Sequence, residues 1–211
     1  MALVSSIERI RGHRIRIKLD DGSCYFLLSS AFRERPLQVG QEIDAGEYAD
    51  WVLKKQYRSA LDHAVAMLAL RACSRGEIRR KLQLTGYSPD TVEMVLYKLE
   101  SNGLLDDLEF ARQWTNSRSG KKYGPYRIER ELRSKGVSRE DTEEVLDAIS
   151  EEDQFRSALD LARKSLKKAK SGEDPRKTQK RAVDAIVRRG FSWETAQKAV
   201  DAVLSGDSDP D

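Results

Sequence analysis

The sequence predicts a mainly α-helical protein that begins with a small antiparallel β segment. Residues 1–45 contain stretches that alternate apolar and polar side chains with a period of two, which is typical of strands. From Gly46 onward, apolar side chains recur at helical spacing instead. One residue pattern occurs three times along this helical part, so we predict three tandem three-helix repeats.

The N-terminal segment contains a predicted hairpin. Residues 14–19 alternate in polarity, Asp20-Asp21-Gly22 provides a tight turn, and residues 23–28 form the returning strand. Residues 3–10 can add a third strand. A sheet this small needs another element to pack on.

Each repeat contains a corner in which a glycine is followed by an apolar residue and a serine. The three corners are Gly86-Tyr87-Ser88, Gly136-Val137-Ser138 and Gly190-Phe191-Ser192. Glycine tolerates the left-handed conformation that ends a helix, and serine is a preferred cap for the next helix. One such repeat buries little apolar surface by itself, so we expect neighbouring repeats to stack.

These patterns divide the chain into segments. We assign residues 1–45 to a β hairpin or meander, 46–57 to a connecting helix, 58–103, 104–150 and 151–205 to the three repeats, and 206–211 to a disordered tail.

Asp106 and Asp107 stand side by side and pose a choice between a carboxylate site and a helix start. With Asp106 as N-cap, Glu109 completes an acidic capping box, and Leu105 and Phe110 occupy the positions of a hydrophobic staple. Asp107 then lies in the first turn, where negative charge is favoured. The rival hypothesis is an enzyme centred on the two aspartates, but no histidine or third carboxylate accompanies them in the pattern. We predict a helix start and no enzymatic activity. The predicted caps and helix stops are Ser74, Asp106, Ser138, Gly86, Gly136 and Gly190.

Composition narrows the classes of function. The formal net charge is only +3, so attraction to a polyanion must come from local patches. The two cysteines and two histidines lack metal-site spacing, and we expect no metal, no cofactor and a reducing compartment. No run of 18 apolar residues occurs, so we expect no signal peptide, no membrane span and a cytoplasmic protein.

Charge is segregated along the helices. Residues 71–81 carry five cations and one acid, and residues 112–135 carry eight cations and two acids. Residues 139–153 reverse the sign, with eight acids and Arg139, and residues 163–181 are basic again. The plainer interpretation is that these are solvated helix faces. As a set, they indicate stripes of opposite charge that can contact a partner. The candidate contact residues are Arg71, Arg75, Arg79, Arg80, Arg112, Arg118, Lys121, Lys122, Tyr123, Arg127, Arg130, Arg133 and Lys135.

Two further patterns bear on the kind of partner. In a helix-turn-helix protein the recognition helix offers basic or amide side chains to bases, but the last helix of each repeat here is acidic or apolar, so we expect no sequence-specific DNA readout. Residues 121–127, a basic loop with two tyrosines, are either a packed linker or a contact loop. Trp51, Trp114 and Trp193 are expected in the core.

Three motifs resemble those of a known protein family. In order they are Ser74-x-x-Glu77-Ile78-x-x-Lys81-Leu82, Gly103-x-x-Asp106-Asp107-x-x-Phe110-Ala111, and Gly124-x-x-Arg127-Ile128-x-x-Glu131-Leu132-x-x-Lys135-Gly136-Val137. This series resembles the RecX family of recombination regulators, most closely over residues 61–146.

The resemblance implies an elongated, curved array of three tandem three-helix repeats. It implies binding in the groove of the RecA–DNA filament, bridging adjacent RecA subunits, with reduced RecA ATP hydrolysis, strand exchange and co-protease activity. No enzymatic activity is implied. Ser74, Asp106 and Gly136 carry over as fold determinants, and Arg127 and Lys135 as basic candidates for contact. We expect a monomer whose partner is the RecA filament and which has no membrane partner. Direct binding to single- or double-stranded DNA, by a protein that does not read sequence, is the alternative.

Overall fold

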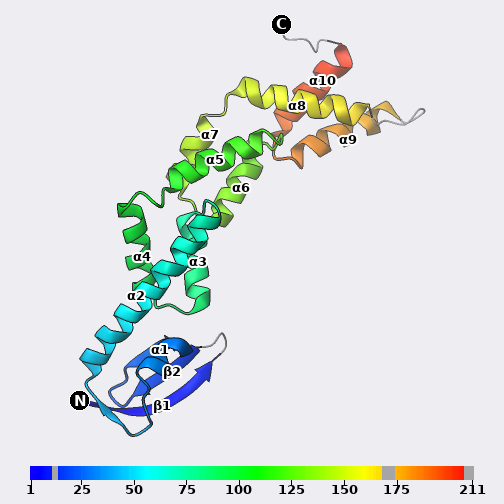
Figure 1. The fold of residues 1–211 in the computed structure, drawn as a ribbon. Coiled ribbons are helices and arrows are strands. Elements are labelled where there is room, and N and C mark those ends of the chain that lie inside the picture. The colour runs from blue at the N-terminus through cyan, green and yellow to red at the C-terminus, as the bar shows by residue number, and fades with distance from the viewer. Residues whose placement is uncertain (11–13, 168–173, 207–211) are drawn as a thin grey trace. The chain divides into compact units, whose positions relative to one another are not determined.

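The computed structural model describes residues 1–10, 14–167 and 174–206 (Figure 1). The predicted tail beyond Gly206, Gly172-Glu173 and the basic residues Lys168 and Lys170 lie outside this part. The described chain forms two compact units, Met1–Asp106 and Asp107–Asp211.

In its described residues, the first unit combines a sheet with four helices. Its elements are β1 (Ala2–Ile10), β2 (Arg14–Leu19), β3 (Cys24–Leu28), α1 (Ser29–Glu34), β4 (Glu42–Ile43), α2 (Ala45–Leu70), α3 (Arg75–Thr85) and α4 (Pro89–Ser101). The second unit is helical in its described part, with α5 (Asp107–Ser119), α6 (Pro125–Lys135), α7 (Arg139–Asp147), α8 (Glu151–Leu166), α9 (Pro175–Val187) and α10 (Trp193–Ser205). The predicted fold class, mainly α with a small N-terminal antiparallel sheet, is confirmed.

The sheet is antiparallel with strand order β3-β2-β1-β4. Ile17 pairs with Ile7 on one side and Tyr25 on the other. The alternation along β2 buries Ile15, Ile17 and Leu19 on one face, as the period of two requires. The hairpin follows from its sequence pattern, whereas β4 and α1 are too short to leave a periodic signal.

The helix α2 contributes side chains to two cores, that of the sheet and that of repeat 1. Tyr48 and Val52 in its first half belong to the core of the sheet, and Ala60 and Ala64 in its second half belong to the core of repeat 1. The predicted boundary between a connecting helix and repeat 1, at residue 57, falls inside α2, which is continuous through that point. No glycine or proline interrupts the chain between Gly46 and Leu70, so nothing there stops it.

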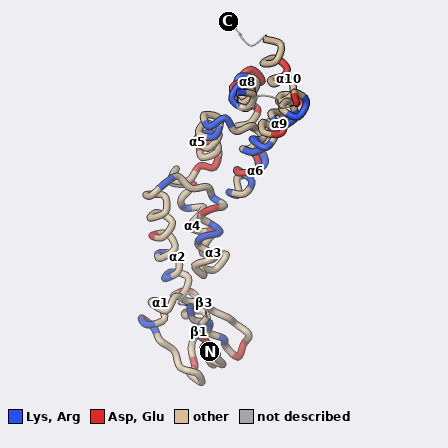
Figure 2. Tube along the Cα trace, turned by 90° about the vertical axis from the view of Figure 1, so that its right-hand side faces the viewer, with Lys and Arg blue, Asp and Glu red and all other residues tan. Residues whose placement is uncertain are grey.

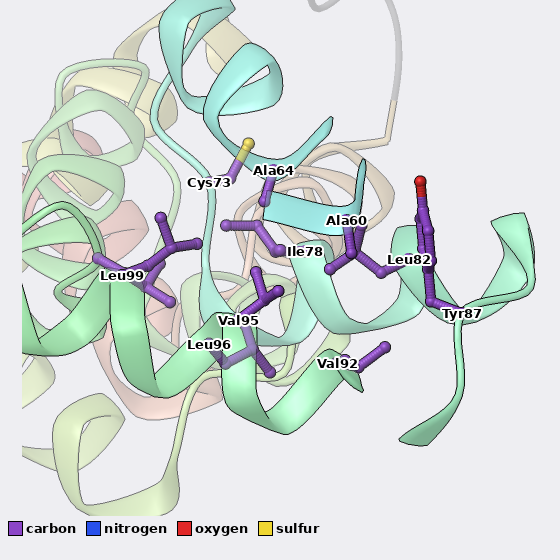
Figure 3. Close-up of a cluster of buried hydrophobic side chains, with 11 residues drawn as sticks. Ala60, Ala64, Cys73, Ile78, Leu82, Tyr87, Val92, Val95, Leu96 and Leu99 are labelled. Atoms are coloured by element: carbon purple, nitrogen blue, oxygen red, sulfur yellow. The ribbon is translucent and has the colours of Figure 1, made fainter. Parts of the chain in front are cut away.

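Repeat 1 is built on a core shared by α2, α3 and α4 (Figure 3). Ala60 and Ala64 lie beside Ile78 and Leu82, and α4 closes the core with four apolar side chains. Those four are Val92, Val95, Leu96 and Leu99. The small side chains of the two alanines leave space beside α2, and the larger side chains of α3 and α4 fill it.

The second unit contains two further cores of the same design. The first is shared by α5, α6 and α7 and contains Phe110, Ile128 and Leu132. The second is shared by α8, α9 and α10. Its members include Ala158, Ala162, Val183, Ile186, Ala196 and Val200. Leu105 belongs to the core of repeat 1 and Phe110 to that of repeat 2, and the staple pairing of these two residues stays a prediction.

The three corners share a glycine with positive φ and a serine that caps the next helix. The glycines have positive φ, +107° at Gly86, +80° at Gly136 and +96° at Gly190. Each following serine caps the next helix through its hydroxyl, which accepts a hydrogen bond from the N–H three residues on. Gly86 and Gly136 are the C-caps of α3 and α6, whereas α9 ends at Val187 with Arg188 as its C-cap, two residues before Gly190.

Along the described part of the chain, no helix has both the length and the apolar character needed to cross a bilayer.

Candidate functional site

Arg75 and Arg79, two of the predicted cations of repeat 1, lie on α3 and are held by carboxylates of the same repeat. Arg75 donates to Glu100 (2.6 Å) and to Glu93 (2.9 Å). Arg79 reaches the same Glu93 through two nitrogens, at 2.8 and 2.9 Å. The hydrogen bond from Arg79 and the further contact with Arg75 lower the pKa of Glu93, against the effect of burial.

The start of α3 adds a third internal pair. Ser74 accepts from the N–H of Glu77 at 3.2 Å, and Glu77 accepts in return from the N–H of Ser74, which makes a complete capping box. The same Glu77 carboxylate accepts from Arg71 at 3.1 Å. Arg80 is exposed on the outer side of α3. The basic stretch 71–81 is therefore largely neutralised by its own repeat.

In repeat 2, Glu131 gathers several of the predicted contact residues around it. Arg118 donates to Glu131 at 2.6 Å, Arg127 at 3.1 Å and the indole N–H of Trp114 at 3.1 Å. Burial raises the pKa of Glu131, but the hydrogen bonds from Arg118 and Arg127 outweigh it and leave that pKa below its ordinary value. The guanidinium of Arg118 also lies 3.9 Å from the centre of the Trp114 ring. This cluster is a packed structural element of repeat 2.

Other basic candidates of repeat 2 also have partners within the unit. Lys135 lies over the Trp114 ring, 4.0 Å from its centre. Arg112 pairs with Glu144 of the acidic helix α7 at 2.8 Å. The acidic stretch 139–153 therefore balances part of the basic stretch before it.

The basic loop between α5 and α6 joins repeat 2 to repeat 3. Lys122 pairs with Asp160 of α8, and Tyr123 lies between two guanidinium groups, with Arg127 at 3.7 Å and Arg189 at 5.3 Å from the ring centre. Arg189 also donates to the backbone carbonyl of Lys121 at 3.1 Å. Tyr123 is thus a packing residue, and the linker interpretation of the loop is the one its contacts favour.

A different set of residues from this region faces outward. Tyr126 is 63% exposed, and Arg130 and Arg133 follow it at helical spacing on the same side of α6. Among the described residues, no carboxylate lies within ion-pair distance of Arg130, and Arg133 reaches Glu129 only at 3.9 Å. Lys121 is exposed near the start of the loop between α5 and α6. We call Lys121, Tyr126, Arg130 and Arg133 the outer stripe of repeat 2.

The two adjacent aspartates begin a helix. The helix α5 starts at Asp107, which places Asp106 at the N-cap position and Asp107 and Glu109 in the first turn. In the described ranges, no group of three or more His, Cys, Asp or Glu side chains is arranged to hold a metal ion.

The tryptophans divide between core and surface. Trp51 and Trp114 are half-buried against the cores of the sheet and of repeat 2. Trp193 is 66% exposed, so its expected place in the core is wrong. The core positions of α10 are Ala196, Ala199 and Val200, and Trp193 precedes this face at the first helical residue. Trp193 stands three residues before Ala196 and seven before Val200, a helical spacing that favours the core face, so the sequence pattern does not reveal its exposure.

Comparison with known proteins identifies the repeats. Family models for the first, second and third three-helix domains of RecX match residues 60–99, 106–146 and 151–200, respectively. Regulatory protein RecX of Prosthecochloris aestuarii is 38% identical over 149 residues, which span 70% of this chain and 95% of that protein. Regulatory protein RecX of Bacillus subtilis is 28% identical over 201 residues, 94% of this chain and 75% of that protein.

Solved structures agree with the fold. A crystal structure of regulatory protein RecX has a TM-score of 0.67 at 25% identity and covers 95% of this chain and 100% of its own. The crystal structure of RecX from Lactobacillus salivarius has a TM-score of 0.67 at 20% identity, with 72% of this chain and 99% of its own covered. At 20% identity, the comparison with the Lactobacillus salivarius protein supports the fold alone.

Proposed function

Because the chain belongs to the RecX family, we propose that it is a regulatory protein that binds in the groove of the RecA–DNA filament and mainly inhibits RecA. The inhibited activities are ATP hydrolysis, strand exchange and co-protease activity. The observation that carries the proposal is the 38% identity to a regulatory protein RecX over 70% of the chain, together with three domain matches in the family's order.

The distribution of charge supports a particular surface for this contact. The cations of α3 and the Glu131 cluster are engaged within their own repeats, so a partner must displace an existing carboxylate to reach them. The outer stripe of repeat 2 has no such competitor at Arg130, and it adds an exposed aromatic at Tyr126. Arginine and tyrosine are the side chains that most often anchor interfaces. We therefore assign the filament contact in repeat 2 to the outer stripe.

The test is the hydrolysis of ATP by RecA on single-stranded DNA while the chain is titrated into the reaction. We expect inhibition at stoichiometric concentrations, and unchanged hydrolysis would overturn the proposal. The double variant Tyr126→Ala/Arg130→Gln should raise the concentration for half-inhibition about tenfold. The matched control is Arg139→Gln, which also removes one exposed cation and whose partner is an acid four residues away. Equal loss in both variants would show that net charge alone matters.

The alternative, a general DNA-binding protein, makes a different prediction. It requires tight binding to bare duplex DNA that weakens steeply with salt and does not need RecA. Fluorescence anisotropy of a labelled duplex, with and without RecA, separates the two functions.

A further inference from the structure

A hollow of about 640 Å³ lies in the first unit, where the ends of β1 and β2 meet α1. Three cations line it, Arg9 from β1, Arg14 from β2 and Arg33 from α1. Figure 2 shows basic positions, in blue, at α1 and in the neighbouring strands. The other described lining residues are Ser29, Ile10, Ile15, Phe32 and Pro36. None of these is acidic, so the hollow combines an apolar floor with a positively charged wall.

The strand register explains why charge and apolar surface meet at this place. Arg9 pairs with Ile15 across β1 and β2, so both side chains point to the face of the sheet that carries its core. Ile7, two residues before Arg9, packs against that core, and so does Phe32 of α1. Arg9 therefore puts a cation at the end of an apolar row, beside apolar side chains that a ligand can contact.

Arg9 and Arg33 have no counter-charge of their own in the described part of the chain. No carboxylate there lies within ion-pair distance of either guanidinium group, and both side chains are exposed. The neighbouring acids Glu8 and Glu34 are each engaged in an ion pair with another cation. A ligand can therefore reach Arg9 and Arg33 without displacing a carboxylate, which is not true of the cations of α3.

Arg14 is positioned by the corner of repeat 1. A Cβ atom added to Gly86 would collide with Cδ of Arg14, so the side chain of Arg14 lies directly against the corner glycine. Arg14 is half-buried there. The wall of the hollow at β2 is therefore held in place by the packing of the sheet on repeat 1.

We propose that this hollow binds a short acidic segment of a protein partner, with carboxylates on Arg9 and Arg33 and one apolar side chain against Phe32. A guanidinium group binds a carboxylate through two parallel hydrogen bonds, and arginine clusters recognise acidic motifs in this way. A protein segment is favoured over nucleic acid because Phe32 is half-buried against the sheet core, so the described lining offers no exposed ring on which a base could stack. The inference does not rest on the proposed function, since its test omits RecA.

The test is equilibrium binding of the full chain to a fluorescein-labelled peptide in which glutamates flank one central leucine, measured by anisotropy. The double variant Arg9→Gln/Arg33→Gln should weaken binding about tenfold. Its urea midpoint should match that of the natural chain, because both side chains are exposed. The control is Lys177→Gln/Arg188→Gln, which removes two exposed cations that also have no carboxylate at ion-pair distance within the described ranges. Equal losses in the two variants would overturn the site.

The peptide itself supplies a second readout that needs no change in the protein. A peptide with serine in place of the leucine should bind the natural chain about tenfold more weakly, because the apolar floor of the hollow then buries no apolar side chain. The double variant should keep this preference for leucine, since its apolar residues are unchanged. Equal affinity of the natural chain for the two peptides would overturn the apolar contact.

Two other anionic ligands complete the experiment. The affinity of the double variant for an oligothymidylate should stay within about twofold of that of the natural chain, because only long-range charge effects change. A loss as large as that for the peptide would overturn the assignment in favour of nucleic acid. Sedimentation with phosphatidylserine vesicles should likewise not depend on Arg9 and Arg33, and a dependence on them would overturn the assignment in favour of a lipid surface.

Discussion

Gly124 and Gly190 are in direct backbone contact, because a Cβ atom added to Gly124 would stand 2.3 Å from the carbonyl oxygen of Gly190. Two hydrogen bonds flank this approach, from the N–H of Gly124 to the carbonyl of Arg189 (2.9 Å) and from the N–H of Tyr126 to that of Gly190 (3.1 Å). The corner glycine of repeat 3 thus has two functions, since it turns the chain and it accepts the loop of repeat 2.

Substitution of Gly124 by Ala should loosen the stacking of repeats 2 and 3. The added methyl group meets backbone atoms, which cannot rotate away, so we expect a loss of about 1–3 kcal/mol in the free energy of unfolding. Urea unfolding followed by circular dichroism measures it. Gly120→Ala is the matched control, because its Cβ would lie 3.5 Å from the nearest atom, in ordinary contact. Equal midpoints for both variants would refute the close approach.

Glu131→Gln should destabilise repeat 2 in a pH-dependent way. The variant leaves Arg118 and Arg127 without a charged acceptor, at a cost of roughly 1–3 kcal/mol at neutral pH. The folded pKa of Glu131 lies below its ordinary 4.5, so its contribution is present above that value and is lost as the pH falls through the folded pKa. Between pH 7 and pH 3, the urea midpoint of the natural chain should therefore fall more steeply than that of the variant.

The control for this experiment is Glu143→Gln, which removes an exposed partner of Arg139. Its effect should be small, because an exposed ion pair is worth little. A Glu131→Gln chain as sensitive to acid as the natural one would contradict the prediction.

Gln56→Leu should weaken the packing of the sheet against repeat 1. The buried Gln56 amide donates to the carbonyl of Phe26 in β3, and its oxygen accepts from the N–H of Ser88 (3.0 Å) and the hydroxyl of Thr91 (3.3 Å). Leucine of similar size leaves these buried groups without a partner, and we expect a loss of about 1–3 kcal/mol in unfolding free energy. Gln83→Leu, on the exposed face of α3, should cost far less. Hydrogen exchange at Ser88 should accelerate in the first variant only.

Glu93→Gln tests whether the cations of α3 contribute to partner binding. Removal of this carboxylate deprives Arg79 of its partner and leaves Arg75 with Glu100 alone. If α3 faces a negatively charged surface of the filament, the variant should inhibit RecA at a several-fold lower concentration at low salt, and the gain should vanish at high salt. Inhibition curves at two salt concentrations measure this. An unchanged curve at low salt would place α3 away from the contact.

The repeats and their corners are predictable from sequence because they depend on local rules. Positive φ at Gly86 and capping by Ser88 and Ser138 need only the residues at the corner itself. The hairpin is equally local. The two-residue strand β4 is different, since it exists only through its pairing with Ala2 and Leu3.

The candidate site was harder to predict because charge counts do not reveal pairing. Arg118 and Arg127 look like exposed cations in the sequence, yet both meet one glutamate that lies between them in space. The contacts of Tyr123 with Arg189 join residues far apart along the chain. A helical count alone identifies the outer stripe, because Tyr126 and Arg130 are four residues apart and neither coincides with the core positions Ile128 and Leu132.

Because α2 is one uninterrupted helix, it connects the sheet rigidly to repeat 1. With no hinge between Tyr48 and Ala64, a twist of repeat 1 turns the strands with it. Cys24, at the start of the edge strand β3, has an exposed thiol, whereas Cys73 is buried. A single maleimide probe attached to Cys24 of the natural chain would therefore report a rotation of repeat 1.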